Sequence, residues 1–150
     1  MNAKSLFHYW SQVRQGLFEA LDKLTDAQLD FVPHPGLWSL RETVCHIAGT
    51  EDGWLRYYAA NRWHEEEAQP HPQDYPTVAD LKALLTKVHQ ETEAQFAQDA
   101  DASMERVVQL PWGSQTTLGW VVWHVLEHEI HHRGEIFLML GMQGIEAPDV

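Results

Sequence analysis

Trp120-Val-Val-Trp-His-Val-Leu-Glu-His-Glu-Ile-His-His-Arg-Gly-Glu-Ile136 is the stretch that decides the fold of this chain. Its apolar residues recur at helical spacing, which predicts one long and mostly buried helix. His124, His128 and His132 are spaced four apart, so they lie one turn above another on nearly the same face. Two such imidazoles facing a protein interior can bind one divalent metal ion. The same spacing fits ordinary histidines that pack between helices, and spacing alone leaves both interpretations open.

The bulk composition predicts a single globular domain over residues 1–150. Apolar residues make up 44% and charged residues 21% of the chain, which is ordinary for a folded domain. The net charge of −12 argues against partners such as nucleic acid or an anionic membrane surface. No stretch approaches the length of a transmembrane helix and no signal peptide is visible, so we expect a cytoplasmic protein.

Helical periodicity recurs along the chain and predicts an all-α fold, a four-helix bundle. The predicted helices span residues 3–24, 39–60, 77–100 and 116–140. The second begins at Ser39–Glu42, which has the spacing of a capping box, and the fourth is capped by Thr116 or Thr117. The remaining segments are predicted to be a short extra turn at 25–29, an irregular connection at 61–75 and a β-like segment at 104–110.

Two carboxylates fall on apolar stripes, where carboxylates are unusual. Glu51 lies on the stripe of the second helix; a place at the rim of the bundle is favoured over burial with a cation. Glu129 lies near the middle of the stripe of the last helix. A structural pair with Arg133, four residues on, is favoured over a role as hydrogen-bond acceptor for a ligand imidazole.

The last helix is apolar on more than one side, because Trp123 and Leu138 face away from Val125. A helix that is apolar all round is either buried centrally or in contact with another subunit. We therefore expect a homodimer.

Three segments resemble the DinB/YfiT-like superfamily of metal-dependent enzymes. They are Pro35-Gly-Leu-Trp-Ser-Leu-Arg-Glu-Thr-Val-Cys-His-Ile-Ala48, His124-Val-Leu-Glu-His-Glu-Ile-His-His-Arg-Gly-Glu-Ile136 and the ending from Gly141 to Pro148. The resemblance implies a four-helix bundle that holds one divalent metal ion through one histidine of the second helix and two of the last.

Matched residue by residue, the metal ligands implied by the resemblance are His46, His128 and His132. The two on the last helix agree with the periodicity, whereas His46 lies off its apolar stripe and depends on the resemblance. His124 and His131 are not expected to be ligands, although either can neighbour the site. Glu135 stands where many members have Gln, a departure that we expect to be harmless.

Three imidazoles leave a coordination position open, and an open position indicates chemistry, because structural zinc sites are closed by four protein ligands. Zn²⁺ or Ni²⁺ suits imidazole. The resemblance implies two uses, since characterised relatives include thiol-dependent S-transferases and a mycothiol-dependent maleylpyruvate isomerase.

The leading hypothesis is therefore a metalloenzyme that activates a low-molecular-weight thiol, or water, for attack on an electrophilic small-molecule substrate. Glu51 is the candidate base, or a group that supports a ligand. The alternatives are a metal-dependent hydrolase and a non-catalytic dimeric module that binds a metal or ligand. A nucleophilic role for Cys45 is rejected, since no base and orienting group are visible beside it.

Overall fold

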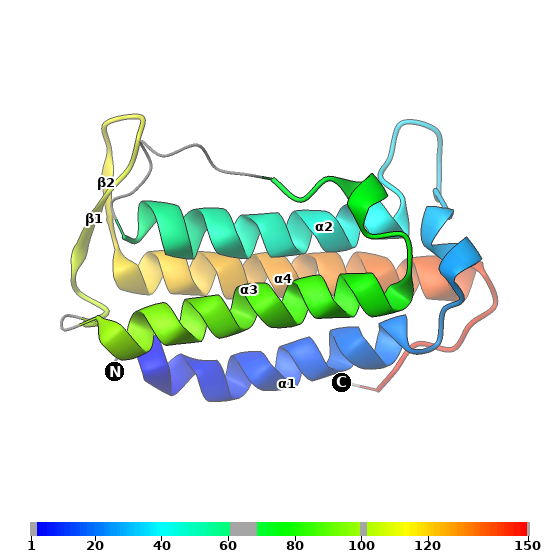
Figure 1. The fold of residues 1–150 in the computed structure, drawn as a ribbon, viewed down its shortest axis with the longest axis horizontal. Coiled ribbons are helices and arrows are strands. Elements are labelled where there is room, and N and C mark those ends of the chain that lie inside the picture. Colours follow the sequence, from blue (N-terminus) through cyan, green and yellow to red (C-terminus); the bar gives the residue numbers. More distant parts are fainter. Residues whose placement is uncertain (1–2, 61–68, 100–101, 150) are drawn as a thin grey trace.

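The computed structural model describes residues 3–60, 69–99 and 102–149, and its helices form a four-helix bundle (Figure 1). The long helices are α1 (Ala3–Leu21), α2 (Leu40–Glu51), α3 (Val78–Gln98) and α4 (Leu118–Met142). The shorter elements are the 3-10 turns η1 (Asp26–Asp30) and η3 (Pro72–Asp74), the π-helical segment η2 (Asp52–Tyr58) and the strands β1 (Val107–Gln109) and β2 (Gln115–Thr117). The all-α prediction is confirmed.

The directions of the four long helices do not alternate along the chain as they do in a simple up-and-down bundle. α1 and α4 run in one direction, and α2 and α3 run in the other (Figure 1). The main contacts of both α1 and α2 are with α3 and α4, so α1 and α2 lie diagonally across the bundle. α2 and α4 are therefore antiparallel neighbours, and side chains from both can meet between them.

Capping side chains begin the helices where the sequence predicts. The Ser39 hydroxyl accepts the Glu42 N–H at 3.2 Å, and the Glu42 carboxylate accepts the Ser39 N–H at 2.7 Å. A second capping box joins Thr77 and Asp80 before α3. Thr117 caps α4 by accepting the Trp120 N–H at 3.2 Å. These bonds satisfy N–H groups that have no partner inside the helix, and so they set where each helix starts.

The ends of all four helices differ from the predicted ones, and α4 ends at Met142 rather than Leu140. α1 ends at Leu21 rather than Leu24. The second helix is α-helical only to Glu51 and continues as η2 to Tyr58, close to its predicted end. α3 ends at Gln98, while the predicted end at residue 100 and residues 61–68 of the irregular connection lie outside the described residues.

The predicted β-like segment pairs with a strand that the sequence did not indicate. β1 and β2 form an antiparallel hairpin with Val108 opposite Thr116. The turn at residues 111–114 joins the two strands, and Gly113 supplies its positive φ of 88°.

The buried apolar side chains form two clusters separated by a polar layer. One cluster includes Leu17, Leu40, Leu85 and Ile136. The other includes Trp10, Leu55, Phe96 and Val121. Arg14, Glu51 and Glu129 are buried between them along α1, α2 and α4.

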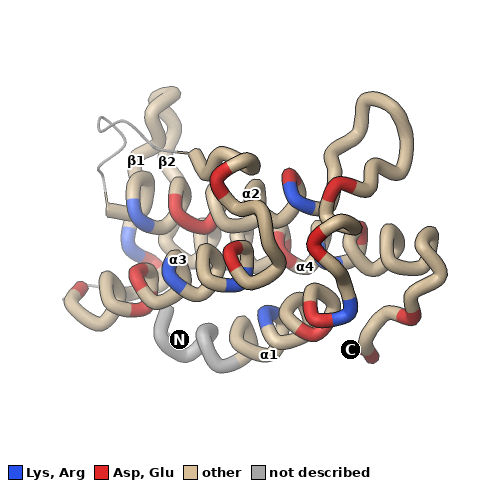
Figure 2. Tube along the Cα trace, turned by 45° about the vertical axis from the view of Figure 1, so that its right-hand side comes forward, with Lys and Arg blue, Asp and Glu red and all other residues tan. Residues whose placement is uncertain are grey.

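Acidic residues outnumber basic ones, 22 to 10. Figure 2 shows acidic residues on all four long helices, with fewer basic residues among them. None of the described helices is long and apolar enough to span a bilayer.

Candidate metal centre

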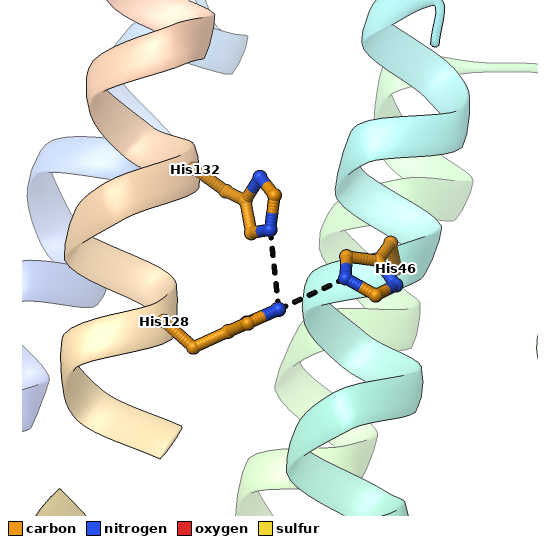
Figure 3. Close-up of side chains that lie close together, drawn as sticks. All are labelled: His46, His128 and His132. Atoms are coloured by element: carbon orange, nitrogen blue, oxygen red, sulfur yellow. Dashed lines mark hydrogen bonds between the residues drawn. The ribbon is translucent and has the colours of Figure 1, made fainter. Parts of the chain in front are cut away.

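Three histidines from two helices converge between α2 and α4. The ring of His46 on α2 and those of His128 and His132 on α4 point toward one another (Figure 3). His128 Nε2 lies 2.9 Å from His46 Nε2 and 3.1 Å from His132 Nε2. Nitrogen ligands at about 2.0–2.1 Å from a tetrahedral zinc ion are about 3.3 Å apart. The three nitrogens therefore have a spacing close to that of a metal site.

The surroundings of His46 and His128 favour the neutral form of both rings. Burial, followed by the neighbouring His132 and His46 rings, lowers the pKa of His128 to about 3. Burial and then the charge of a protonated His132 lower the pKa of His46 as well. A metal ion binds the neutral form of imidazole, so protons compete weakly for this site at neutral pH.

The hydrogen bond to Glu135 determines which nitrogen of His132 faces the cluster. Glu135 Oε2 lies 2.6 Å from His132 Nδ1, and in a neutral ring this contact places the proton on Nδ1 and leaves a lone pair on Nε2. His128 Nε2 carries at most one proton, so it can donate a hydrogen bond to only one of its two imidazole neighbours. Hydrogen bonds among the three rings therefore cannot use every nitrogen lone pair that points into the cluster. A cation where the three nitrogens meet would accept all of these lone pairs. The donor set therefore fits a divalent metal ion.

The cluster leaves space for a reactant. Among the described residues, no fourth imidazole, thiol or carboxylate joins His46, His128 and His132 to complete a four-ligand group. Thr50 Oγ1 lies 3.4 Å from His128 Nε2. Trp38 covers the other side, with its ring centroid 4.5 Å from that of His46 and 6.2 Å from that of His132.

The two histidines that were not expected to be ligands lie beside the cluster. His124 stacks on Trp120 with ring centroids 4.8 Å apart and planes 8° apart. His131 has 65% of its side chain exposed and contacts Glu135 at 3.1 Å. His131, His132 and Glu135 also bring potential metal-binding atoms together. That group is more exposed and shares His132 with the three-histidine cluster.

A buried ionic network lies behind the histidines. Arg14 donates to both oxygens of Glu129, at 2.6 and 2.8 Å, and to Glu51 at 2.7 Å. Trp10 Nε1–H donates to Glu129 Oε2 at 2.6 Å, and His89 Nδ1 lies 2.9 Å from Glu51 Oε1. Burial alone would raise the pKa of the Glu51 carboxyl, but Arg14 and His89 outweigh it and hold that pKa below its ordinary value.

This network corrects two predictions. The favoured position of Glu51 at the rim is wrong, because its side chain is only 1% exposed and pairs with Arg14. The predicted Glu129–Arg133 pair is also wrong, because Glu129 pairs with Arg14 while Arg133 Nη1 lies 3.4 Å from the Val13 carbonyl. In both cases the cation comes from α1, which the periodicity of a single helix cannot reveal.

Two other side chains bear on catalysis. The catalytic role of Glu51 stays a prediction, and its contacts with Arg14 and His89 favour a structural role. Cys45 is buried, and burial raises the pKa of its thiol to about 11. A thiol of that pKa is protonated at neutral pH, which supports the rejection of a cysteine nucleophile.

Sequence reasoning missed the role of Arg14, the position of Trp38 and the hydrogen bond that Glu135 accepts from His132. A signal for Arg14 was available, since it lies on the apolar stripe of α1 four residues after Trp10. Charged residues on three separate stripes indicate a buried ionic cluster. The position of Trp38 over a ligand ring has no comparable signal, because it depends on how the loop before α2 folds.

Comparisons with known proteins agree with this architecture. The sequence profile of the DinB superfamily matches residues 9–136. The "Uncharacterized protein YizA" of Bacillus subtilis is 27% identical over 132 residues, which cover 87% of this chain and 80% of YizA.

Solved structures show the same fold. A DinB-like protein from Bacillus cereus superposes with a TM-score of 0.79 at 21% identity, covering 98% of this chain and 96% of the other. YfiT from Bacillus subtilis superposes with a TM-score of 0.57 at 24% identity, covering 93% of this chain and 87% of YfiT. YfiT is described as "a probable metal-dependent hydrolase with an unusual four-helix bundle topology".

Proposed function

This chain belongs to the DinB superfamily, and on that premise we propose that it is a metal-dependent enzyme with His46, His128 and His132 as ligands of one divalent cation per chain. The observation that carries the proposal is the convergence of three imidazoles from α2 and α4, whose lone pairs cannot all be satisfied by one another. Zn²⁺ and Ni²⁺ are the cations that suit this donor set.

The chain's own residues would prepare such a site for a reactant. Glu135 holds the His132 ring through Nδ1, and Trp38 shields His46 from solvent on one side. A bound divalent cation supplies Lewis-acid chemistry, lowering the pKa of a water or thiol that coordinates it. The reaction that we propose is therefore attack on an electrophilic small molecule by a low-molecular-weight thiol or by water.

Hydrolysis is the second candidate reaction. The description of YfiT as a probable metal-dependent hydrolase favours water as the nucleophile in a structural relative. The same cluster of ligands serves both reactions, so the choice depends on which co-reactant is consumed. A homodimer in the cytoplasm stays our expectation for either.

The first experiment asks whether the metal site exists. Purified wild type is compared with His128→Ala for bound zinc and nickel after dialysis, with His124→Ala as a control on the same helix. We expect about one ion per chain in wild type and control, and loss of stoichiometric binding in His128→Ala. Undiminished stoichiometry in His128→Ala would remove the site.

The second experiment separates the reactions. Thiol consumption with monochlorobimane is measured beside hydrolysis of a neutral aryl ester, each with and without chelator. Chelator-sensitive thiol consumption supports a transferase, and chelator-sensitive ester cleavage supports a hydrolase. Metal binding without either activity across a panel of thiols and esters favours a non-catalytic binding module.

A further inference from the structure

A pocket of about 330 Å³ adjoins the histidine cluster. Leu37 and Trp38 form one wall from the loop before α2, and Leu138 and Met139 form the other from the last turns of α4. Gly36 has a φ of 90° and makes the turn that presents the first wall. The volume is at the lower end of the range of about 300–1,000 Å³ that holds small molecules.

The pocket and the histidine cluster share side chains. His132 and Glu135 line the pocket as well as belonging to the site. Trp38 lines the pocket while its ring packs against His46, with centroids 4.5 Å apart. A group bound in the pocket is therefore next to the rings that would hold the cation.

The apolar walls are open to solvent. Leu37 is 58% exposed, Trp38 48% and Leu138 66%. Large apolar side chains gathered at the mouth of a pocket indicate a surface that an apolar group covers on binding.

Glu135 and Thr43, two polar side chains of the pocket, already have partners within the protein. The Glu135 carboxylate contacts His132 at 2.6 Å and His131 at 3.1 Å. The Thr43 hydroxyl donates to the Ser39 carbonyl at 2.9 Å. None of the described lining residues is a lysine or arginine, so an anionic occupant would find no cationic partner there. The net charge of −12 further disfavours anions.

We infer that this pocket binds an uncharged apolar group of the substrate, aromatic or branched aliphatic, with the reactive carbon directed toward His132. The inference rests on the proposed function, because it places the substrate relative to the proposed cation. The substrate class is therefore an electrophile that carries no negative charge and has an aryl or alkyl substituent beside its reacting carbon.

The test in zinc-loaded protein uses two hydroxamates that chelate metal equally but differ in their apolar part. Calorimetry compares acetohydroxamate with benzohydroxamate. We expect benzohydroxamate to bind roughly 10-fold tighter or more, because its phenyl ring is buried in the pocket. Leu37→Ser and Leu138→Ser should reduce this preference to about 2- or 3-fold. Ile130→Ser, which changes an exposed aliphatic residue of α4 outside the pocket, should retain it.

A second measurement does not depend on metal. N-phenyl-1-naphthylamine, a neutral aromatic dye, is titrated into chelator-treated protein and its fluorescence followed. We expect an increase in wild type and Ile130→Ser, and its loss in Leu138→Ser. Circular dichroism of each variant checks that the helices are retained.

The outcomes distinguish this inference from the proposed function. Stoichiometric zinc binding with equal affinity for both hydroxamates and no dye signal overturns the pocket and leaves the proposed function standing. A dye signal that Leu138→Ser removes, in a protein that binds no zinc, supports the pocket and overturns the proposed function. If wild type gives no dye signal and forms a dimer that Leu138→Ser dissociates, a second copy of the chain occupies the pocket, and the inference is overturned.

Discussion

At the residue scale, the two ring nitrogens of His132 contact different groups. Nε2 faces the other two histidines, while Nδ1 faces the Glu135 carboxylate at 2.6 Å. A carboxylate behind a ligand imidazole fixes the tautomer and the ring orientation, and it makes the ligand more basic. The sequence marked Glu135 only as a departure from the family, whereas the structure makes it a positioning residue of the proposed site.

We expect Glu135→Ala to lower zinc affinity by roughly 10- to 100-fold, the range seen when such supporting partners are removed. Glu135→Gln should cost less, because its amide oxygen can still accept the Nδ1–H bond. Competition against a chromophoric chelator measures the affinities. Glu127→Ala, an exposed acid on α4, controls for the loss of charge. Equal losses in Glu127→Ala and Glu135→Ala would contradict a specific role.

Arg14 is the second residue whose position has a measurable consequence. Arg14→Met would leave the buried carboxylates of Glu51 and Glu129 without their cation. Removing one member of a buried ionic group costs about 3–5 kcal/mol. Urea unfolding measures the loss, and Lys87→Met, at a side chain 71% exposed, should change stability little.

A combined variant tests the cause of that loss. Replacing the group as Arg14→Met, Glu51→Leu and Glu129→Leu removes the uncompensated charge, and we expect it to recover much of the stability lost by Arg14→Met. A triple variant as unstable as the sum of its single changes would show that the packing, rather than the unpaired charge, was responsible.

At the element scale, the cap of α2 sets where His46 lies. The capping box of Ser39 and Glu42 begins the helix that carries His46 toward α4. Thr77 and Asp80 begin α3 in the same way, and α3 supplies none of the three ligands. The two caps are therefore chemically similar, but only the cap of α2 begins a helix that carries a proposed ligand.

We expect Ser39→Ala and Thr77→Ala each to cost about 1 kcal/mol of unfolding free energy, because each removes an N-cap. Only Ser39→Ala should also weaken zinc binding, since fraying of the first turn of α2 loosens the position of His46. Urea unfolding and a chelator competition on the same samples check both parts. If the two variants bind zinc equally, the cap of α2 has no role in placing the ligand.

At the scale of the whole molecule, the folded bundle favours the neutral form of two histidines, whereas in acid the unfolded chain favours their protonated form. The pKa values of His46 and His128 are both lowered from 6.5 in the fold, that of His128 to about 3. Below about pH 6.5 the unfolded chain therefore binds more protons than the folded chain. The stabilisation that comes from holding His46 and His128 neutral is therefore present above about pH 6.5. It is lost as the pH falls toward the pKa values of the folded state.

We expect the unfolding free energy of chelator-treated protein to fall steadily from about pH 7 to about pH 4. Glu51, whose pKa is also held low by Arg14 and His89, adds to the loss at the acid end. Urea unfolding at stepped pH measures the slope. His128→Asn, which cannot titrate at this position, should give a shallower slope.

Metal should stabilise the whole bundle, because its proposed ligands join α2 to α4. Zinc at a free concentration of 1,000 times its dissociation constant should raise the unfolding free energy by about 4 kcal/mol. Urea unfolding with and without zinc measures the increase, and His128→Ala should show none. An equal increase in His128→Ala would place the stabilising ion elsewhere on this acidic chain.

The sequence by itself determined the local features of this protein. Helical periodicity and capping residues predicted four helices and the starts of the second and fourth, and the spacing of His128 and His132 placed them on one face of α4. These features depend on residues within a few positions of one another, where backbone geometry leaves few choices.

The tertiary structure decided what depends on how the helices are rotated and paired. It brought His46 to the other two histidines, although His46 lies off its own apolar stripe, and it paired Arg14 with Glu51 and Glu129. It also folded the loop that presents Trp38 beside the cluster. The physical reason is that periodicity specifies the face of a helix but not the helix that packs against it.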